Sequence, residues 1–171
     1  DGKSDILWRN SSTGQNTVWK SANSATGLTV ATLATDWVVA EIGDFSGDGK
    51  SDILWRNAAA GANSIWKSAD SATTQSVSSI AAPWQVVPDP GLQGAPATTG
   101  PSALVLSSSG SAAMAMDFNG DGKSDLLLRN ADSAQNLIWS AADSLAVQSV
   151  SSATGAWTVS GMGDFNGDHR S

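Results

Sequence analysis

Oxygen-bearing side chains alternate through two copies of a nine-residue loop, and this alternation is the clearest chemical signal in the sequence. In "DFSGDGKSD", side-chain oxygens stand at loop positions 1, 3, 5 and 9, and the main-chain carbonyl of a lysine is available at position 7. Ca²⁺ takes about six to eight oxygen ligands in a flexible geometry, so donors spaced in this way around a turn suit it. Glycine at position 6, Gly49 or Gly122, permits the sharp turn that points the donors inward. The predicted ligands are Asp44, Ser46, Asp48, Lys50 and Asp52 in the first copy, and Asp117, Asn119, Asp121, Lys123 and Asp125 in the second.

The two loops differ from each other and from the calcium loop of an EF-hand. Ser46 is a weaker ligand than Asn119, so the first loop is expected to bind calcium less tightly than the second. Position 12 holds Trp55 or Leu128 instead of the glutamate that an EF-hand requires, so the aspartate at position 9 must complete the ligand shell. A plainer interpretation stays open, because Asp-Gly pairs are common in the turns of β-hairpins without any metal.

Parts of the same loop stand at both ends of the sequence, as "DGKSD" at 1–5 and "DFNGDHRS" at 164–171. In the second part, His169 replaces the turn glycine and the aspartate of position 9 is missing, so Asp5 is a candidate for the missing carboxylate. In that arrangement residues 1–4 and residues 168–171 correspond to the same positions of the loop, so only one of the two segments can take that place. The further predicted ligands are Asp1, Asp5, Asp164, Asn166 and Asp168, with the main-chain carbonyls of Lys3 and Arg170.

A fixed internal spacing shows that these loops belong to a repeat. Asp5 and Asp52 are 47 residues apart, and so are Asp117 and Asp164. Within each unit two apolar positions are 11 residues apart, and a tryptophan follows 18 residues later. The positions are Trp8, Trp19 and Trp37, then Trp55, Trp66 and Trp84, and then Leu128, Trp139 and Trp157. An insertion at 88–113 interrupts the third unit.

Short runs rich in Val, Ile, Thr and Trp, separated by Gly, Asp, Asn and Ser, predict β-strands joined by turns. Four such runs in a unit are typical of a β-propeller blade, for which repeats of roughly 40 to 50 residues are usual. The predicted fold is therefore all-β, with three four-stranded propeller-like blades and a split terminal blade. The predicted units are a partial blade with the last three strands at 1–33, a full blade at 34–81, a blade with the insertion at 82–153, and a first strand with part of its loop at 154–171.

The two ends of the sequence are complementary in this scheme. Residues 156–165 are predicted to form a first strand and residues 1–33 the second to fourth, so together they would complete one blade. In the insertion, the first half is rich in Pro, Gly and Ala and is typical of a loop. Its second half, "SALVL" and "AAMAMDF" around "SSSG", is either a hairpin or the remnant of a degenerate unit.

Composition limits the functions that remain. A net charge of −7 argues against a nucleic-acid surface, which needs clustered Lys and Arg. The chain has no apolar run of about 18 residues, which excludes a helical membrane span. With one His, one Glu and no Cys or Tyr, it has almost no parts for a catalytic triad or a histidine metal cluster, so we predict that it is not an enzyme.

Tryptophans and arginines also recur at equivalent positions of the units. The tryptophans are predicted to pack between blades, although stacking on a sugar would also explain them. The arginines are predicted to donate structural hydrogen bonds, with a groove that holds a polar ligand as the alternative. These residues are Trp19, Trp66 and Trp139, and Arg9, Arg56 and Arg129.

The segments "GDFSGDGKSDILWRN" and "MDFNGDGKSDLLLRN" resemble the FG-GAP or VCBS-type repeat of integrin α-subunit propellers, propeller lectins and secreted bacterial repeat proteins. The resemblance covers nearly all of the chain except 88–113. It implies Ca²⁺ bound in the first turn of each blade. The positions that match the family motif are Asp44, Asp48, Asp52, Asp117, Asn119, Asp121 and Asp125.

We therefore expect a secreted or cell-surface, calcium-binding propeller module with a non-catalytic role in recognition or adhesion, and with a glycan or a protein as its ligand. Loops of this kind bind calcium at roughly 10⁻⁴ to 10⁻³ M, which is adequate only where calcium is millimolar, as it is outside cells. Known propellers use at least about four blades. The alternative expectation is therefore a building block that pairs with copies of itself, either in a ring or in a head-to-tail filament.

Overall fold

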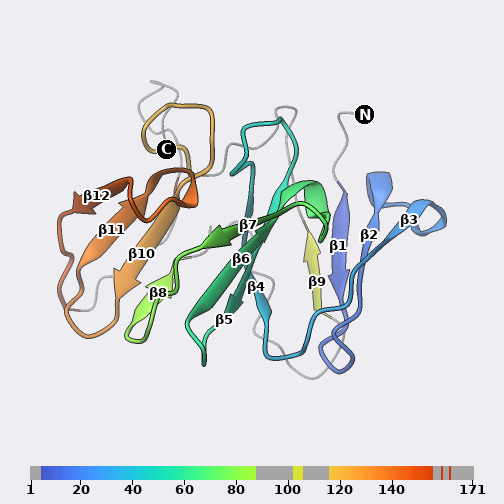
Figure 1. The fold of residues 1–171 in the computed structure, drawn as a ribbon, viewed down its shortest axis with the longest axis horizontal. Coiled ribbons are helices and arrows are strands. Elements are labelled where there is room, and N and C mark those ends of the chain that lie inside the picture. Colours follow the sequence, from blue (N-terminus) through green and yellow to red (C-terminus); the bar gives the residue numbers. More distant parts are fainter. Residues whose placement is uncertain (1–4, 88–101, 106–115, 156–158, 160–161, 163–171) are drawn as a thin grey trace.

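The computed structural model describes residues 5–87, 102–105, 116–155, 159 and 162. These residues form three four-stranded antiparallel sheets that stand side by side (Figure 1), which confirms the predicted all-β, propeller-like fold. Blade A has the strand order β9-β1-β2-β3, blade B the order β4-β5-β6-β7, and blade C the order β8-β10-β11-β12. No helix in the described part of the chain is long and apolar enough to cross a membrane.

The strands are short, as expected for runs of β-branched and aromatic residues between turn residues. Blade A contains β1 (Ile6–Arg9), β2 (Asn16–Trp19), β3 (Gly27–Val30) and β9 (Ser102–Val105). Blade B contains β4 (Val38–Gly43), β5 (Asp52–Asn57), β6 (Ala62–Trp66) and β7 (Thr74–Val77). Blade C contains β8 (Trp84–Val86), β10 (Leu126–Asn130), β11 (Asn136–Trp139) and β12 (Val147–Val150). Short 3₁₀ turns follow the third strand of each blade, which is β2, β6 or β11. They are η1 (Lys20–Ala22) and η2 (Ser24–Thr26) in blade A, η3 (Lys67–Ala69) in blade B and η5 (Ser140–Ala142) in blade C.

The insertion lies inside the first strand of blade C. β8 pairs with one end of β10, and Val87 N–H continues the ladder to the carbonyl of Leu127 at 2.8 Å. At the other end of β10, Asp125 N–H donates to the carbonyl of Met116 at 2.7 Å. In blade B the equivalent first strand is continuous but shifts register between Val39 and Glu41. The chain thus departs from blade C at the point where a bulge already loosens the ladder in blade B.

A segment of the insertion completes blade A. β9 pairs antiparallel with the open edge of β1, from Ile6 opposite Val105 to Arg9 opposite Ser102. The sequence predicts residues 156–165 as this strand, whereas in the structure β9 occupies the place. An unpaired strand edge offers a row of free N–H and C=O groups, and the insertion brings a run of strand-forming residues within reach of it. Most of residues 156–165, and all of 106–115, lie outside the described residues.

Blade B is covered on both faces, and its core follows the alternation of a strand. Ile53, Trp55 and Trp66 pack against blade A, in a cluster with Leu7 and Val30. The other face of blade B packs against blade C; the residues of that cluster include Leu54, Ile65, Val77, Leu126, Leu128 and Trp139. Trp66 and Trp139 therefore pack between blades, as predicted. The third member of the set, Trp19, is half-buried and lies 4.7 Å from Trp8, measured between ring centroids.

An arginine and an asparagine clamp the same end of every blade. In blade B, Arg56 Nη1 donates to Asn63 Oδ1 at 2.9 Å, and Nη2 donates to the carbonyls of Ile80 and Trp84 at 2.9 and 3.3 Å. Asn63 Nδ2 in turn donates to the carbonyl of Ser78 at 2.8 Å. The equivalent pairs are Arg9 with Asn16 at 3.0 Å and Arg129 with Asn136 at 2.9 Å. The clamp ties two strands to the segment that leads into the next blade, which confirms a structural role for the arginines.

Replacement of Arg56 by lysine tests this clamp. A lysine ammonium is a point charge and cannot form the fork that reaches Asn63 and both carbonyls, so buried acceptors would be left unpaired. We expect Arg56→Lys to lower the free energy of unfolding by about 2 to 3 kcal/mol in urea titrations. Lys20→Ala, at an exposed side chain, should stay within about 0.5 kcal/mol of the parent protein. Equal stability of Arg56→Lys and the parent would show that the clamp is dispensable.

Candidate metal centre

The first aspartate of each acidic loop gathers the amides of its own loop. Asp44 Oδ1 accepts hydrogen bonds from the N–H groups of Gly47 and Asp48 at 2.7 and 3.1 Å, and Oδ2 accepts one from Gly49 at 2.7 Å. Asp117 makes the same three bonds with its own loop at 2.7, 3.1 and 2.9 Å. Gly49 and Gly122 have φ of +79° and +81°, so the expected turn glycines do adopt the left-handed conformation.

The aspartate at position 9 joins the loop to the turn that follows the third strand of the same blade. Asp52 Oδ2 accepts from Ser46 N–H at 2.9 Å, and Oδ1 accepts from Ser68 N–H at 2.7 Å. Asp125 makes the same pair of bonds with Phe118 and Ala141, at 3.0 and 2.9 Å. In blade A the equivalent carboxylate of Asp5 accepts from Ser21 N–H at 2.8 Å.

The turns that these carboxylates hold are strained. Ser68 and Ala141 both have a φ of +50°, and in each turn the next residue is also left-handed. Two left-handed residues in succession define a type I′ turn, which glycine and asparagine normally occupy. Here a serine or alanine adopts the conformation while its N–H is bonded to a buried carboxylate. The aspartate at position 9 thus stabilises a left-handed turn conformation that the serine and alanine residues of the turn disfavour.

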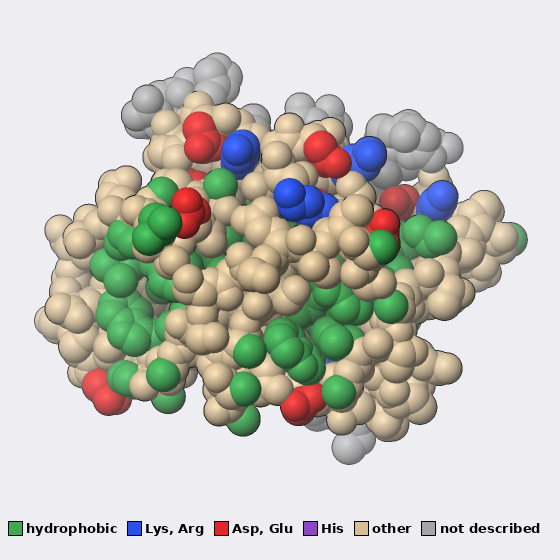
Figure 2. All heavy atoms as spheres, in the orientation of Figure 1, with side chains coloured by type: hydrophobic (Ala, Val, Ile, Leu, Met, Phe, Trp, Pro, Cys, Tyr) green, Lys and Arg blue, Asp and Glu red, His purple; other side chains and the backbone are tan. Residues whose placement is uncertain are grey.

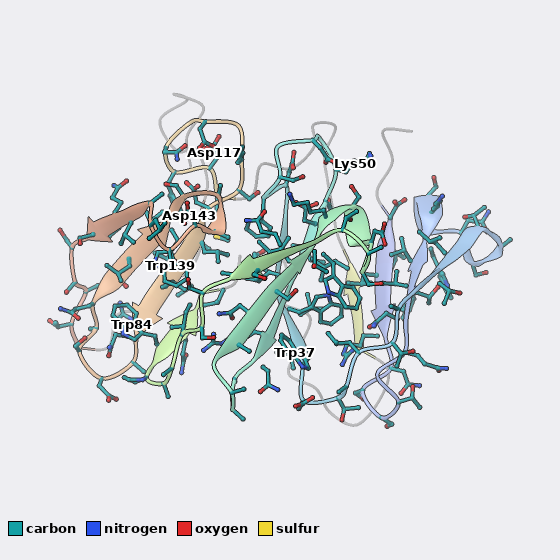
Figure 3. The ribbon with its side chains drawn as sticks, viewed as in Figure 1. Trp37, Lys50, Trp84, Asp117, Trp139 and Asp143 are labelled. Carbon is teal, nitrogen blue, oxygen red and sulfur yellow. The ribbon has the colours of Figure 1, made fainter. Side chains whose placement is uncertain are left out.

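Neighbouring loops are bonded to each other across the interface between blades B and C. Ser124 Oγ accepts from Asp44 N–H at 3.0 Å, and Ser124 N–H donates to the Asp44 carbonyl at 2.9 Å. A Cβ placed on Gly43 would lie 2.6 Å from Ser124 Oγ, so only glycine leaves room for this contact. Both loops rise from the same edge of the sheets, where Figure 3 labels Lys50 and Asp117.

Burial and mutual repulsion act on the carboxylates of each loop. Burial raises the pKa of the Asp52 carboxyl above its ordinary value, and the negative charge of Asp44 adds to the rise, against the hydrogen bonds from the amides. Burial likewise raises the pKa of Asp125, with further contributions from Asp121 and Asp117. Each loop therefore concentrates negative charge in a place where water cannot fully solvate it.

The donor set fits a hard cation, although the carboxylates do not converge on one point. Among the described residues, no three Asp, Glu, His or Cys side chains form a cluster of the kind that holds a metal ion. Asp48 instead accepts from Lys50 N–H at 2.9 Å and from Ser68 Oγ at 3.1 Å. Each carboxylate oxygen has two lone pairs, so oxygens that accept a single N–H bond keep a lone pair for a metal.

The structure describes only part of the predicted ligand set. It places the two intact loops and Asp5 at equivalent points of their blades. The other predicted ligands lie outside the described residues, and they are Asp1, Lys3, Asp164, Asn166, Asp168 and Arg170.

Comparison with known proteins agrees with the repeat geometry. Residues 1–55 and 117–171 each match the family model of the FG-GAP-like repeat. This chain belongs to the FG-GAP-like repeat family. Neither a search of curated proteins nor a search of solved structures finds a match. FG-GAP-like repeats form β-propeller-type modules, occur typically in extracellular or surface proteins, and are generally non-catalytic.

Some residues that shape these FG-GAP-like loops were missed in the sequence. Ser124 stands in "GKSD", which occurs three times, and the recurrence of its serine marked a position with a structural task. The turn residues that donate to the position-9 carboxylates come from "WKSA", which occurs twice and has the variant "WSAA" in blade C. The repeats signalled that these residues matter, but no local rule indicated which atoms they would meet.

The raised pKa of Asp52 predicts an unusual dependence of stability on pH. The folded state holds this proton more tightly than the unfolded chain, so the contribution of Asp52 to stability falls as pH rises from about 4 through its folded pKa. In buffers freed of calcium beforehand with a chelating resin, the free energy of unfolding of the parent protein minus that of Asp52→Asn should therefore decrease between pH 4 and pH 7. Urea titrations at several pH values measure this difference. The same difference measured for Asp132→Asn, at an exposed side chain, should not change with pH. A difference for Asp52→Asn that increases with pH would contradict a raised pKa of Asp52 in the folded state.

Proposed function

We propose that this FG-GAP-like chain is a calcium-stabilised, extracellular, non-catalytic recognition module. The observation that carries the proposal is the burial of carboxylates in both intact acidic loops. Asp52 and Asp125 are fully buried and Asp44 and Asp117 nearly so. The one ion pair with a loop carboxylate among the described residues is the 3.9 Å contact between Lys50 Nζ and the partly exposed Asp48. Buried charge is costly unless it is paired or coordinates a metal.

Calcium would relieve this cost with the donors that each loop already presents. Three aspartates, an oxygen-bearing side chain at position 3 and the carbonyl at position 7 supply hard oxygens from one short segment. At about 2 mM calcium and a dissociation constant of roughly 10⁻⁴ to 10⁻³ M, each filled loop would stabilise the fold by about 0.6 to 2 kcal/mol. Several loops together would rival the net stability of a small domain. The ion would then act as a folding cofactor, which suits a protein that works outside cells.

Asparagine at position 5 of both loops tests the calcium proposal. Asp48 and Asp121 are exposed, so Asp48→Asn/Asp121→Asn removes two ligand charges with little damage to packing. We expect 2 mM calcium to raise the melting temperature of the parent protein by about 3 to 10 °C over EGTA, and that of the double variant by less than half as much.

Two controls accompany this experiment. Asp132→Asn should keep the full calcium response, because Asp132 lies in an exposed turn away from the loops. Magnesium, which demands a tighter octahedral site, should produce a much smaller shift than calcium. A parent protein that melts at the same temperature in calcium and in EGTA would refute the proposal.

A second candidate function, head-to-tail assembly, rests on the two outer faces of the array. Val77 of blade B is 7 % exposed because blade C covers it, whereas its equivalent in blade C, Val150, is 37 % exposed. On the opposite side, Trp55 is fully buried against blade A, whereas its equivalent Trp8 is only half-buried. The open face of blade C therefore repeats, at Val150, a position that blade C covers on blade B, whereas Leu127 and Ile138 on the same face are buried. The open face of blade A repeats, at the half-buried Trp8, a position that blade A covers on blade B.

These two open faces are complementary in the way that blades B and C are. A second copy of the chain could place its blade A on blade C and continue the array, closing a ring or extending a filament. Each new contact would bury apolar residues of a type that the chain already buries twice, and the hydrophobic gain would favour association.

Light scattering tests the assembly. We expect the purified chain in 2 mM calcium to have a mass that is a multiple of the single-chain mass, and Val150→Asp to reduce it by placing a charge on the open face. Ser149→Asp is the matched control, because the neighbouring residue in β12 points to the opposite face of the strand. A single-chain mass at every concentration would exclude self-assembly. The outer faces of blades A and C would then be expected to pack against further blades of a longer array.

A further inference from the structure

A polar groove of about 420 Å³ lies between blades B and C, beside the two acidic loops. One wall comes from the loop, the turn and the outer strand of blade B, and the other from the loop and the turn of blade C. The side chains used below are Ser46, Lys67 and Gln75 on the first wall and Lys123, Asp143 and Ser144 on the second. Figure 3 labels Asp143 close to the acidic loop of blade C.

The two lysines of the groove differ from their counterparts in the neighbouring repeats. Lys67 is half-buried, whereas Lys20, which occupies the same position of the turn in blade A, is exposed. Lys123 is half-buried as well, whereas Lys50, at the same loop position in blade B, is exposed. The same sequence position thus has a more buried environment at the interface between blades B and C.

The stem of Lys123 is held against the loop of blade B. A Cβ placed on Gly47 would lie 3.1 Å from Lys123 Cγ and 3.2 Å from Lys123 Cε. The side chain therefore crosses the interface and lies on the bare Cα of this glycine. A lysine held by its methylene groups loses less conformational entropy when its ammonium binds a ligand than a freely rotating one does.

The groove carries more positive than negative charge in a protein with a net charge of −7. In the described part of the chain, neither Lys67 nor Lys123 has a carboxylate within 4.0 Å of its ammonium nitrogen, because the one such pair involves Lys50. Asp143 is the single acid in the lining, and its Oδ1 accepts from Leu145 N–H at 2.9 Å. Figure 2 shows basic and acidic side chains close together along the edge of the molecule that carries the loops.

The remaining groups of the groove suit hydroxyls. Serine hydroxyls and the amide of Gln75 both donate and accept hydrogen bonds, and Asp143 can accept from a ligand hydroxyl. A volume of this size falls in the usual range for small-molecule sites, roughly 300 to 1,000 Å³. A ligand that fills it would present one or two carboxylates to the lysines and several hydroxyls to the walls.

From these features we infer that the groove between blades B and C binds an acidic saccharide, a sugar chain that carries uronate carboxylates. The inference rests on the proposed function as a recognition module and names its site and ligand class. Lys67 and Lys123 bind the carboxylate from opposite walls as point charges, and the serines, Gln75 and Asp143 bind ring hydroxyls. Because the two lysines come from different blades, binding requires the interface between B and C to be intact.

Calorimetric titration with a galacturonate trisaccharide in 2 mM calcium tests this inference, with a neutral galactose trisaccharide as the paired ligand. The parent protein should bind the acidic sugar at least tenfold more tightly than the neutral one. Lys67→Gln and Lys123→Gln should each weaken binding of the acidic sugar about tenfold. Lys20→Gln is the matched control, since it removes the same charge from the same turn of blade A, and it should change affinity less than twofold.

Several results would overturn the inference. They are no binding of the acidic sugar at millimolar concentration, equal affinity for the two sugars, and equal loss of affinity in Lys67→Gln and Lys20→Gln. The calcium-dependent melting shift, measured on the same samples, separates this failure from failure of the proposed function. A protein that keeps its calcium response but ignores the acidic sugar refutes the groove assignment alone, whereas one without a calcium response refutes the proposed function.

Discussion

Every blade of this protein depends on cover from a neighbour. A small four-stranded sheet with apolar residues on both faces cannot bury them by itself, and a sheet of short strands has little stability of its own. Blade B shows how the requirement is met, since every residue of β5 is buried between blades A and C. The positions of Trp66 and Trp139 follow from this constraint, because each indole fills the gap between its own blade and the preceding one.

The polar features of the structure hold the blades at the separation that this cover requires. Arg9 shows the link most directly, because it bonds the segment that leads into blade B and also lies 5.0 Å from the centroid of the Trp55 ring. The bonds between Ser124 and Asp44 serve the same end at the loop edge. The acidic loops are therefore built into the interfaces between blades and are not appendages at their tips. A change of charge in a loop is felt by two blades at once.

Much of this arrangement could be predicted from the sequence, because a repeat multiplies weak local signals. One run such as "NTVWK" is poor evidence for a strand, but its recurrence at a fixed interval made the blades and the glycine turns predictable. The pairing of β9 with β1 could not be foreseen, since a short apolar run near SALV has many possible partners and only the tertiary fold selects one. Nor could the left-handed Ser68 and Ala141, because their conformation is imposed by a carboxylate sixteen residues earlier. The metal ligands stay a prediction.

The pairing of β9 with β1 affects the order in which the blades can form during synthesis. A chain made from its N-terminus presents β1 to β3 as a three-stranded sheet whose β1 edge has no partner until residue 105 has been made. At roughly 5 to 20 residues per second, the stretch from the end of β3 to residue 105 takes about 4 to 15 s to synthesise. During that interval blade B can form and shield the inner face of blade A, while the edge stays open to pairing with other chains. Blade A thus begins before blade B in the sequence but is completed after it, when the insertion supplies β9.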